Sequence, residues 1–238
     1  MPVIQHLGTA IGSGDDDGLV LHLDASNSSS YPGSGSTWTD LSGQGNHVTL
    51  TGTTYSSSNG GYLIFDGNND YGTVPAIDLT STQFTLSIWT FIQDYYQNSS
   101  IIFLGDTNLS PGNGRMVNVH SIPYSGNQWY YDKGFDGTNY DRISGGVQLS
   151  DYNNWTYWSF TANSSTGSMK MYRNGTLFSS GTGKTKPMGN ANGDSRYIGR
   201  SISAYYDGYI SKVLMYKKEL LASELLQQFN NDKAAYGL

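Results

Sequence analysis

The sequence predicts an all-β domain in which two antiparallel sheets pack face to face as a jelly-roll sandwich, with one short helix near the C-terminus. Three observations support this prediction. Many short segments alternate apolar and polar residues, as half-buried strands do. Turn signals rich in Gly, Asn and Asp separate these segments. Only one segment, close to the C-terminus, carries an apolar stripe with helical spacing. Many short strands and a single terminal helix are typical of a sandwich or jelly roll.

The predicted strands follow one another from residue 18 onward. The clearest alternation is in "FTLSIWTFI", where Phe84, Leu86 and Ile88 fall on one face. The other expected strands lie in 18–25, 62–74, 99–106, 115–121, 153–163, 197–200 and 208–220.

A hairpin and the helix complete the expected elements. In "SMKMYRNGTLFSSG", Asn174-Gly175 is a favoured type I′ pair, because both central residues of that turn need a positive φ. Leu221, Leu225 and Phe229 recur every four residues in "LLASELLQQFNNDKAA", which predicts one amphipathic helix.

The sequence divides into an N-terminal arm, residues 1–17, and one domain, residues 18–238. The arm has a short apolar piece followed by the acidic hinge "GSGDDD". Two interpretations remain open: a disordered leader, or a peg that docks into another protein or a neighbouring copy. The apolar residues that such a docking arm would use are Val3, Ile4, Leu7 and Ile11.

Composition excludes several classes of protein. The net charge is −6 and no basic cluster stands out, so we expect neither nucleic acid nor an anionic membrane as a partner. The chain has no cysteine, which excludes a disulfide framework and thiolate metal sites. Its N-terminal stretch has no basic region and no long apolar run, so we expect neither a signal peptide nor a membrane helix.

Seven motifs occur in an order that resembles a known family. They are "GLVLHLDAS", "WTDLSGQGNH", "LIFDGNNDYGTV", "FTLSIWTF", "NNWTYWSFTAN…MKMYRNGTL", "YIGR" and "DGYISKVLMYKKELLASELLQQFN". From residue 18 to 236 the chain resembles the laminin-G-like, concanavalin A-like lectin/glucanase superfamily, in the form found in tailed-phage virion proteins and bacterial surface proteins. The resemblance implies a concanavalin A-like jelly roll that binds glycans or proteins through its loops or concave face, often with calcium.

Catalysis is not expected from the carboxylates. Glycoside hydrolysis needs two of them at a defined separation, and the resemblance implies that relatives which are glucanases place two glutamates on one strand. This chain has only Glu219 and Glu224, both at the junction between the last strand and the helix. Aspartates remain an alternative pair, although Asp66-Gly67, Asp136-Gly137 and Asp207-Gly208 are turn dipeptides. The four histidines show no metal-ligand spacing and are expected to be structural.

A sugar-binding surface is predicted between Asp94 and Asn154, where aromatic rings and polar side chains are dense. Gly and Asp interrupt the strand pattern of "WYYDKGFDGTNYD", so we expect a long aromatic loop there. The alternative is that these rings are cross-strand partners within the sheets. The candidate ligand-binding residues are Tyr95, Tyr96, Trp129, Tyr130, Tyr131, Tyr140 and Tyr152, of which Trp129, Tyr130 and Tyr131 are expected to stack on the ligand.

Two oxygen-rich loops are candidate calcium sites, because calcium prefers carboxylate and amide oxygens. "WTDLSGQGNH" offers Asp40 and Asn46, and "FDGNNDY" offers Asp66, Asn69 and Asp70. Neither loop has EF-hand spacing. The favoured interpretation is a turn whose side chains accept backbone N–H groups, with calcium as the alternative.

These observations together predict a non-catalytic, lectin-like virion protein with a structural, decoration or appendage role. It would be made in a host cytoplasm and bind host-surface glycans, other virion proteins or its own copies. Two alternative functions stay open: a glycoside hydrolase or depolymerase of the same fold, and an assembly protein with no ligand. The alternative location is outside a bacterium or on its surface.

Overall fold

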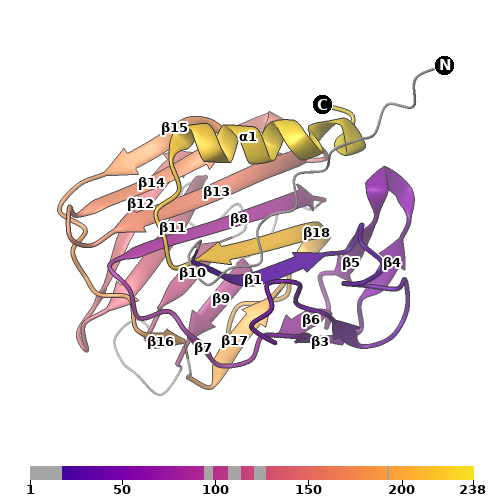
Figure 1. The fold of residues 1–238 in the computed structure, drawn as a ribbon, viewed down its shortest axis with the longest axis horizontal. Helices are drawn as coiled ribbons and strands as arrows, with labels where there is room; N and C mark the ends of the chain where they lie inside the picture. Colours follow the sequence, from indigo (N-terminus) through magenta and orange to yellow (C-terminus); the bar gives the residue numbers. More distant parts are fainter. Residues whose placement is uncertain (1–17, 94–98, 107–113, 121–126, 192) are drawn as a thin grey trace.

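The computed structural model describes residues 18–93, 99–106, 114–120, 127–191 and 193–238. Within these residues the predicted architecture is confirmed: two antiparallel sheets of eight strands lie face to face, with one short C-terminal helix (Figure 1). The predicted arm, with Val3, Ile4, Leu7 and Ile11, lies outside the described residues. None of the described helices combines the length and apolar character that crossing a bilayer requires.

The first sheet, sheet A, carries the helix on its outer face. Its strands follow the order β15 (Thr176–Gly181), β14 (Ser168–Arg173), β13 (Trp155–Asn163), β8 (Gln83–Ile92), β18 (Asp207–Tyr216), β5 (Tyr62–Asp66) and β4 (Thr54–Ser56), and β1 (Leu19–Asp24) pairs with β18.

The second sheet, sheet B, faces sheet A across the core. Its strands follow the order β12 (Tyr140–Gly146), β11 (Gln128–Phe135), β10 (Val117–His120), β9 (Ser100–Gly105), β17 (Ser195–Ile198), β6 (Tyr71–Thr73), β3 (Val48–Thr51) and β2 (Thr37–Trp38). The short strands β7 (Ile77–Asp78) and β16 (Asn190–Ala191) form a separate pair, and the single 3₁₀ turns are η1 (Ser58–Gly60), η2 (Leu149–Asp151) and η3 (Lys233–Tyr236).

Aromatic residues from both sheets fill the space between them. The rings of Trp129 on β11 and Trp158 on β13 lie 4.3 Å apart, and those of Tyr131 and Phe160 lie 5.3 Å apart. All four side chains are fully buried. Because side chains alternate along a strand, Trp129 and Tyr131 on β11 enter the core, while Tyr130 and Asp132 between and after them face outward.

Helix α1 (Ala222–Asp232) packs on the outer face of sheet A, where Figure 1 shows it above β13, β14 and β15. Its Phe229 and the following Tyr236 stack on Trp89 of β8, with ring centroids 5.8 and 4.0 Å apart. The predicted helix is therefore confirmed. Because it lies on the outer face of sheet A, the outer face of sheet B is on the opposite side of the sandwich.

The hairpin predictions have two outcomes. Asn174 and Gly175 both adopt positive φ, as the type I′ interpretation requires. The predicted aromatic loop between Trp129 and Asp141 is wrong, because β11 and β12 form a continuous hairpin there. Gly134 has a φ of 65° and lies where the register shifts, so it is a bulge within the strand. Asp136 belongs to the turn, where its carboxylate accepts the backbone N–H of Asn139.

Candidate functional site

A row of neighbouring side chains crosses the outer face of sheet B. Asn118 on β10 pairs with Phe103 on β9 and with Asp132 on β11, and Asp132 pairs in turn with Arg142 on β12. Val117 and Val119, on either side of Asn118, point into the core. The period of two along each strand therefore places polar and charged groups on the outer face, opposite the apolar core.

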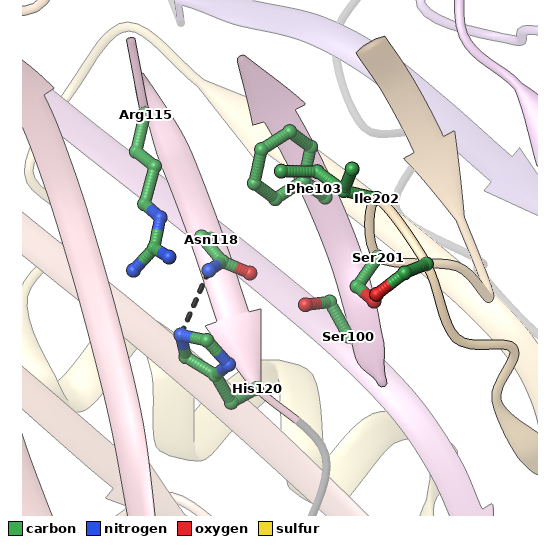
Figure 2. A pocket seen from close by; sticks show the side chains of 8 residues that line it. Ser100, Phe103, Arg115, Asn118, His120, Ser201 and Ile202 are labelled. Atoms are coloured by element: carbon green, nitrogen blue, oxygen red, sulfur yellow. Dashed lines mark hydrogen bonds between the residues drawn. The ribbon is translucent and has the colours of Figure 1, made fainter. Parts of the chain in front are cut away.

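A cavity of about 240 Å³ opens on this face, and we call it the sheet B pocket. Figure 2 shows its walls, formed by β9 and β10 on one side and by the loop after β17 on the other. A cavity of this volume has room for a small ligand, of about the size of one sugar ring. Its lining residues are Ser100, Phe103, Arg115, Asn118, His120, Ser201, Ile202 and Ser203.

A buried carboxylate organises one wall of the pocket. Asp132 is fully buried, and its Oδ1 accepts a hydrogen bond from Arg142 Nε at 2.5 Å. Its Oδ2 accepts from Arg142 Nη2 at 2.8 Å and from Arg115 Nη1 at 2.7 Å. Arg142 thus holds the carboxylate with two parallel hydrogen bonds, and Arg115 adds a third.

His120 lies against this carboxylate. Its Nε2 is 3.2 Å from Asp132 Oδ2 and 2.8 Å from Asn118 Nδ2. Burial lowers the pKa of His120, and although Asp132 opposes this effect, Arg115 and Arg142 reinforce it. The imidazole is therefore neutral at pH 7.

The ionisation of Asp132 follows from the same contacts. Burial by itself would raise the pKa of Asp132, but the hydrogen bonds from Arg142 and His120 and the charge of Arg142 outweigh burial and lower the pKa to about 2. The carboxylate is therefore charged at neutral pH. Such a group accepts hydrogen bonds and cannot donate a proton to a leaving group.

Tyrosine rings support both arginines. The guanidinium carbon of Arg142 lies 4.6 Å from the ring centre of Tyr130, and that of Arg115 lies 4.7 Å from the ring centre of Tyr140. These cation–π contacts fix the direction of each guanidinium before any ligand is bound.

Several buried polar atoms around the pocket have no hydrogen-bond partner among the described residues. They are Ser100 Oγ, Asn118 Oδ1 and Arg115 Nε. Ser100 and Asn118 are 0% and 1% exposed. In Figure 2 the Asn118 amide oxygen and the Ser100 hydroxyl face the same space. Buried polar atoms are almost always hydrogen-bonded, so these atoms have hydrogen-bonding capacity left for water or for a ligand in the pocket.

The structure places the predicted ligand-binding residues in different environments. Tyr130 and Tyr140 lie half-buried on the outer face, beside the pocket. The prediction that Trp129 and Tyr131 stack on a ligand is wrong, because both point into the core and are 0% exposed. Tyr152 is also buried in the core cluster, so it cannot present its ring to a ligand. Tyr95 and Tyr96 lie outside the described residues.

The first candidate calcium loop forms a closed turn. Asp40 Oδ1 accepts the backbone N–H groups of His22 and Ser42, and Oδ2 accepts the Ser42 hydroxyl and the Asn46 N–H, all within 2.9 Å. The Asn46 amide donates to the carbonyl of Val20. These donors occupy the oxygens that a cation would need, so the loop does not fit a calcium ion in this arrangement.

The second candidate loop also forms a turn. Asp66 Oδ1 accepts the N–H groups of Asn68 and Asn69, and Asp70 Oδ2 accepts the N–H of Asp66. Across the described part of the chain, no three acidic or histidine side chains come together as a metal site.

Sequence reasoning missed the residues that matter most here, namely Ser100, Phe103, Arg115, Asn118, Asp132 and Arg142, and it assigned His120 only a structural role. One signal was present. In "VNVH" and "WYYDK" polar residues alternate with residues expected in the core, and a sheet with one buried face would place them together on the other.

The comparisons with known proteins agree with this architecture. Residues 66–226, more than half of the chain, match the family model of the concanavalin A-like lectin/glucanases superfamily. No curated protein sequence matches the chain.

Solved structures show the same fold at low sequence identity. Domain 4 of AbnA, a GH43 extracellular arabinanase from Geobacillus stearothermophilus solved in complex with arabinotriose, is 17% identical, with a TM-score of 0.64 over 89% of this chain and 98% of that one. The botulinum neurotoxin type G receptor binding domain is 16% identical, with a TM-score of 0.63 over 90% of this chain and 51% of that one. The serotype D binding domain is 15% identical, with a TM-score of 0.66 and corresponding shares of 92% and 53%. The chain thus spans about half the length of the neurotoxin domains. It belongs to the concanavalin A-like lectin/glucanases superfamily.

Proposed function

We propose that this protein is a non-catalytic carbohydrate-binding module that takes one sugar unit in the sheet B pocket. The observation that carries the proposal is the set of buried, unpartnered polar atoms: Ser100 Oγ and Asn118 Oδ1 face the cavity without a partner in the described part of the protein. Leaving a buried acceptor or donor unsatisfied costs about 1–3 kcal/mol. Sugar hydroxyls, which both donate and accept, would satisfy these atoms.

The remaining walls suit a sugar as well. Phe103 lines the pocket with an apolar side chain, and the loop 201–203 adds two serine hydroxyls. The hydrogen bonds and stacked rings around Asp132 hold the polar wall in place. A binding site that is already ordered loses little conformational entropy when the ligand arrives.

Catalysis is disfavoured by the position of the carboxylates. Asp132 keeps a pKa of about 2 and its two oxygens accept three hydrogen bonds from arginine. Glu219 bonds Lys170 and Asn163, and Glu224 accepts the N–H of Leu221 at the start of α1. Neither glutamate lines the pocket. The described residues of the pocket therefore lack the carboxylate pair that glycoside hydrolysis requires.

A glycan array with the purified protein, run in calcium and again in EDTA, tests the proposal. Asn118→Ala should abolish the binding that the wild-type protein shows. Tyr209→Ala is the matched control, because Tyr209 belongs to another half-buried aromatic cluster, on the outer face of sheet A, with its ring 4.7 Å from that of Tyr62. Loss of binding in the Tyr209 variant alone would place the site on sheet A and contradict the proposal. Release of reducing sugar from a bound glycan would favour the hydrolase alternative.

The setting that fits such a module is display in many copies on a virion or another extracellular assembly. A single pocket for one sugar unit binds weakly, and many copies on one particle raise the overall avidity. The arm, residues 1–17, would attach the module to its assembly. Deleting it should abolish attachment and leave glycan binding intact. If the deletion changes neither, the docking role of the arm is wrong.

A further inference from the structure

We infer that the sheet B pocket selects a sugar that bears a carboxylate, and that Arg115 binds this carboxylate. The inference rests on the proposed function and narrows its ligand to acidic glycans, such as those that contain a uronic or sialic acid. Three observations on the described residues support it: the charge balance of the site, the edge of the Arg115 guanidinium that bonds none of them, and the neighbouring polar atoms that also bond none of them.

The charges around the pocket do not cancel. Asp132 contributes one negative charge, whereas Arg115 and Arg142 contribute two positive charges, and all three groups are in contact. Nearby, Arg200 lies just before the loop 201–203, stacked on three tyrosine rings, and no described acidic residue pairs with it. These four described groups together carry a net positive charge, in a chain whose net charge is −6. A local positive field of this kind attracts anions.

The guanidinium groups of the two arginines beside Asp132 differ in how many of their N–H donors bond this carboxylate. Arg142 uses its Nε–Nη2 edge on the two oxygens of Asp132, so that edge is occupied. Arg115 uses only Nη1 on the same carboxylate. Its Nε and Nη2 donate no hydrogen bond to any described residue, and Nε is buried at the pocket. Nε–H and Nη2–H lie on one edge of the planar group, and their spacing matches the two oxygens of a carboxylate.

Nearby atoms suit the rest of an acidic sugar. Asn118 Oδ1 is an acceptor and Ser100 Oγ is both donor and acceptor, so they can bond ring hydroxyls next to the carboxylate. The Arg115 side chain is only 14% exposed and is held by Tyr140. An ion pair formed here would be poorly screened by solvent, and its loss would be costly.

The direct test uses the unmodified protein with paired ligands. Oligosaccharides that contain glucuronic, galacturonic or sialic acid are compared with the same oligosaccharides after each carboxylate has been reduced to a primary alcohol. Isothermal titration should give binding for at least one acidic form, and a Kd at least about tenfold higher for its reduced partner. This comparison needs no variant and therefore does not depend on whether a mutated protein folds.

Variants then locate the contact. Arg115→Gln should raise the Kd for the acidic form by about tenfold or more. Arg115→Lys should raise it less, because lysine keeps the positive charge but lacks the two parallel N–H donors of the guanidinium. Lys170→Gln is the matched control: it removes one positive charge from sheet A, where Lys170 pairs with Glu219, and should leave the Kd unchanged.

The outcomes separate this inference from the proposed function. Equal affinity for acidic and reduced forms, or binding of neutral or sulfated glycans only, would overturn the inference and leave the carbohydrate-binding proposal standing. Weaker binding in Lys170→Gln to the same degree as in Arg115→Gln would also overturn it, since the effect would then come from net charge. Failure to bind any glycan would overturn both.

Discussion

Replacing Asp132 by Asn removes the negative charge that two guanidinium groups share. The carboxylate accepts hydrogen bonds from Arg142 and Arg115 on both of its oxygens. An asparagine side chain offers one oxygen, and its NH₂ group would face arginine donors. The variant therefore leaves two neighbouring positive charges without their partner and one donor against another donor.

The magnitude follows from the ionisation of Asp132 and the exposure of its partners. The difference between an ordinary aspartate pKa of 3.8 and about 2 corresponds to about 2 kcal/mol of stability at neutral pH. Breaking a buried ion pair by removing one partner costs about 3–5 kcal/mol. Because the Arg142 side chain is 29% exposed, we expect the lower end of that range, about 3 kcal/mol.

Urea denaturation of both proteins at pH 7 and at pH 2.5 measures this loss. The folded-state pKa of Asp132 lies below the unfolded value, so its contribution is present above about pH 4 and fades as the pH falls toward 2. The difference between wild type and Asp132→Asn should therefore shrink at pH 2.5. Glu219→Gln, which breaks the partly exposed pair with Lys170, should cost about 1 kcal/mol or less. A loss below about 1 kcal/mol in Asp132→Asn, or an equal loss at both pH values, would refute the reasoning.

Three further predictions concern neighbouring residues. Trp129→Ala should lower the free energy of unfolding by about 3–5 kcal/mol, because Trp129 is buried in the core. Tyr130→Ala loses only a half-exposed contact with Arg142 and should lower it by about 1 kcal/mol. Equal losses in the two variants would contradict the assignment of these side chains to opposite faces of sheet B. Burial lowers the pKa values of His120 and His22, so as the pH falls the unfolded chain binds protons before the folded chain does. Stability should therefore decrease as the pH drops below about 6.5. In melting curves measured over a range of pH, His120→Gln should reduce this decrease, and an unchanged decrease would count against a neutral imidazole. Asp40→Ala should lower the free energy of unfolding by about 2 kcal/mol, because the carboxylate accepts four hydrogen bonds within the turn. The loss should be the same in calcium and in EDTA. If calcium raised the Tm of the wild-type protein and Asp40→Ala abolished that rise, the loop would be a metal site.

Local pattern was enough to predict most of the elements. Alternation placed the strand that contains Phe84, and the positive φ required by Asn174-Gly175 identified a hairpin. The stripe of Leu225 and Phe229 identified the helix. Each of these signals lies within a few residues of sequence, where backbone sterics and side-chain period act directly.

The same local reasoning failed between Trp129 and Asp141. Gly134 and Asp136 weaken a strand pattern, but one is a bulge and the other a turn residue of a paired hairpin. The pairing partners supply the hydrogen bonds that hold this segment extended, and they are not visible in the segment itself.

The sequence alone determined the fold class, the lack of two glutamates on one strand and the supply of aromatic and polar side chains. Only the tertiary structure decided which of these side chains meet. Ser100, Asn118, Asp132 and Arg142 come from four strands, and their contacts depend on strand order and register across sheet B. A shift of one residue in any strand would turn its outward groups into the core, so the pocket exists only once the whole sheet is aligned.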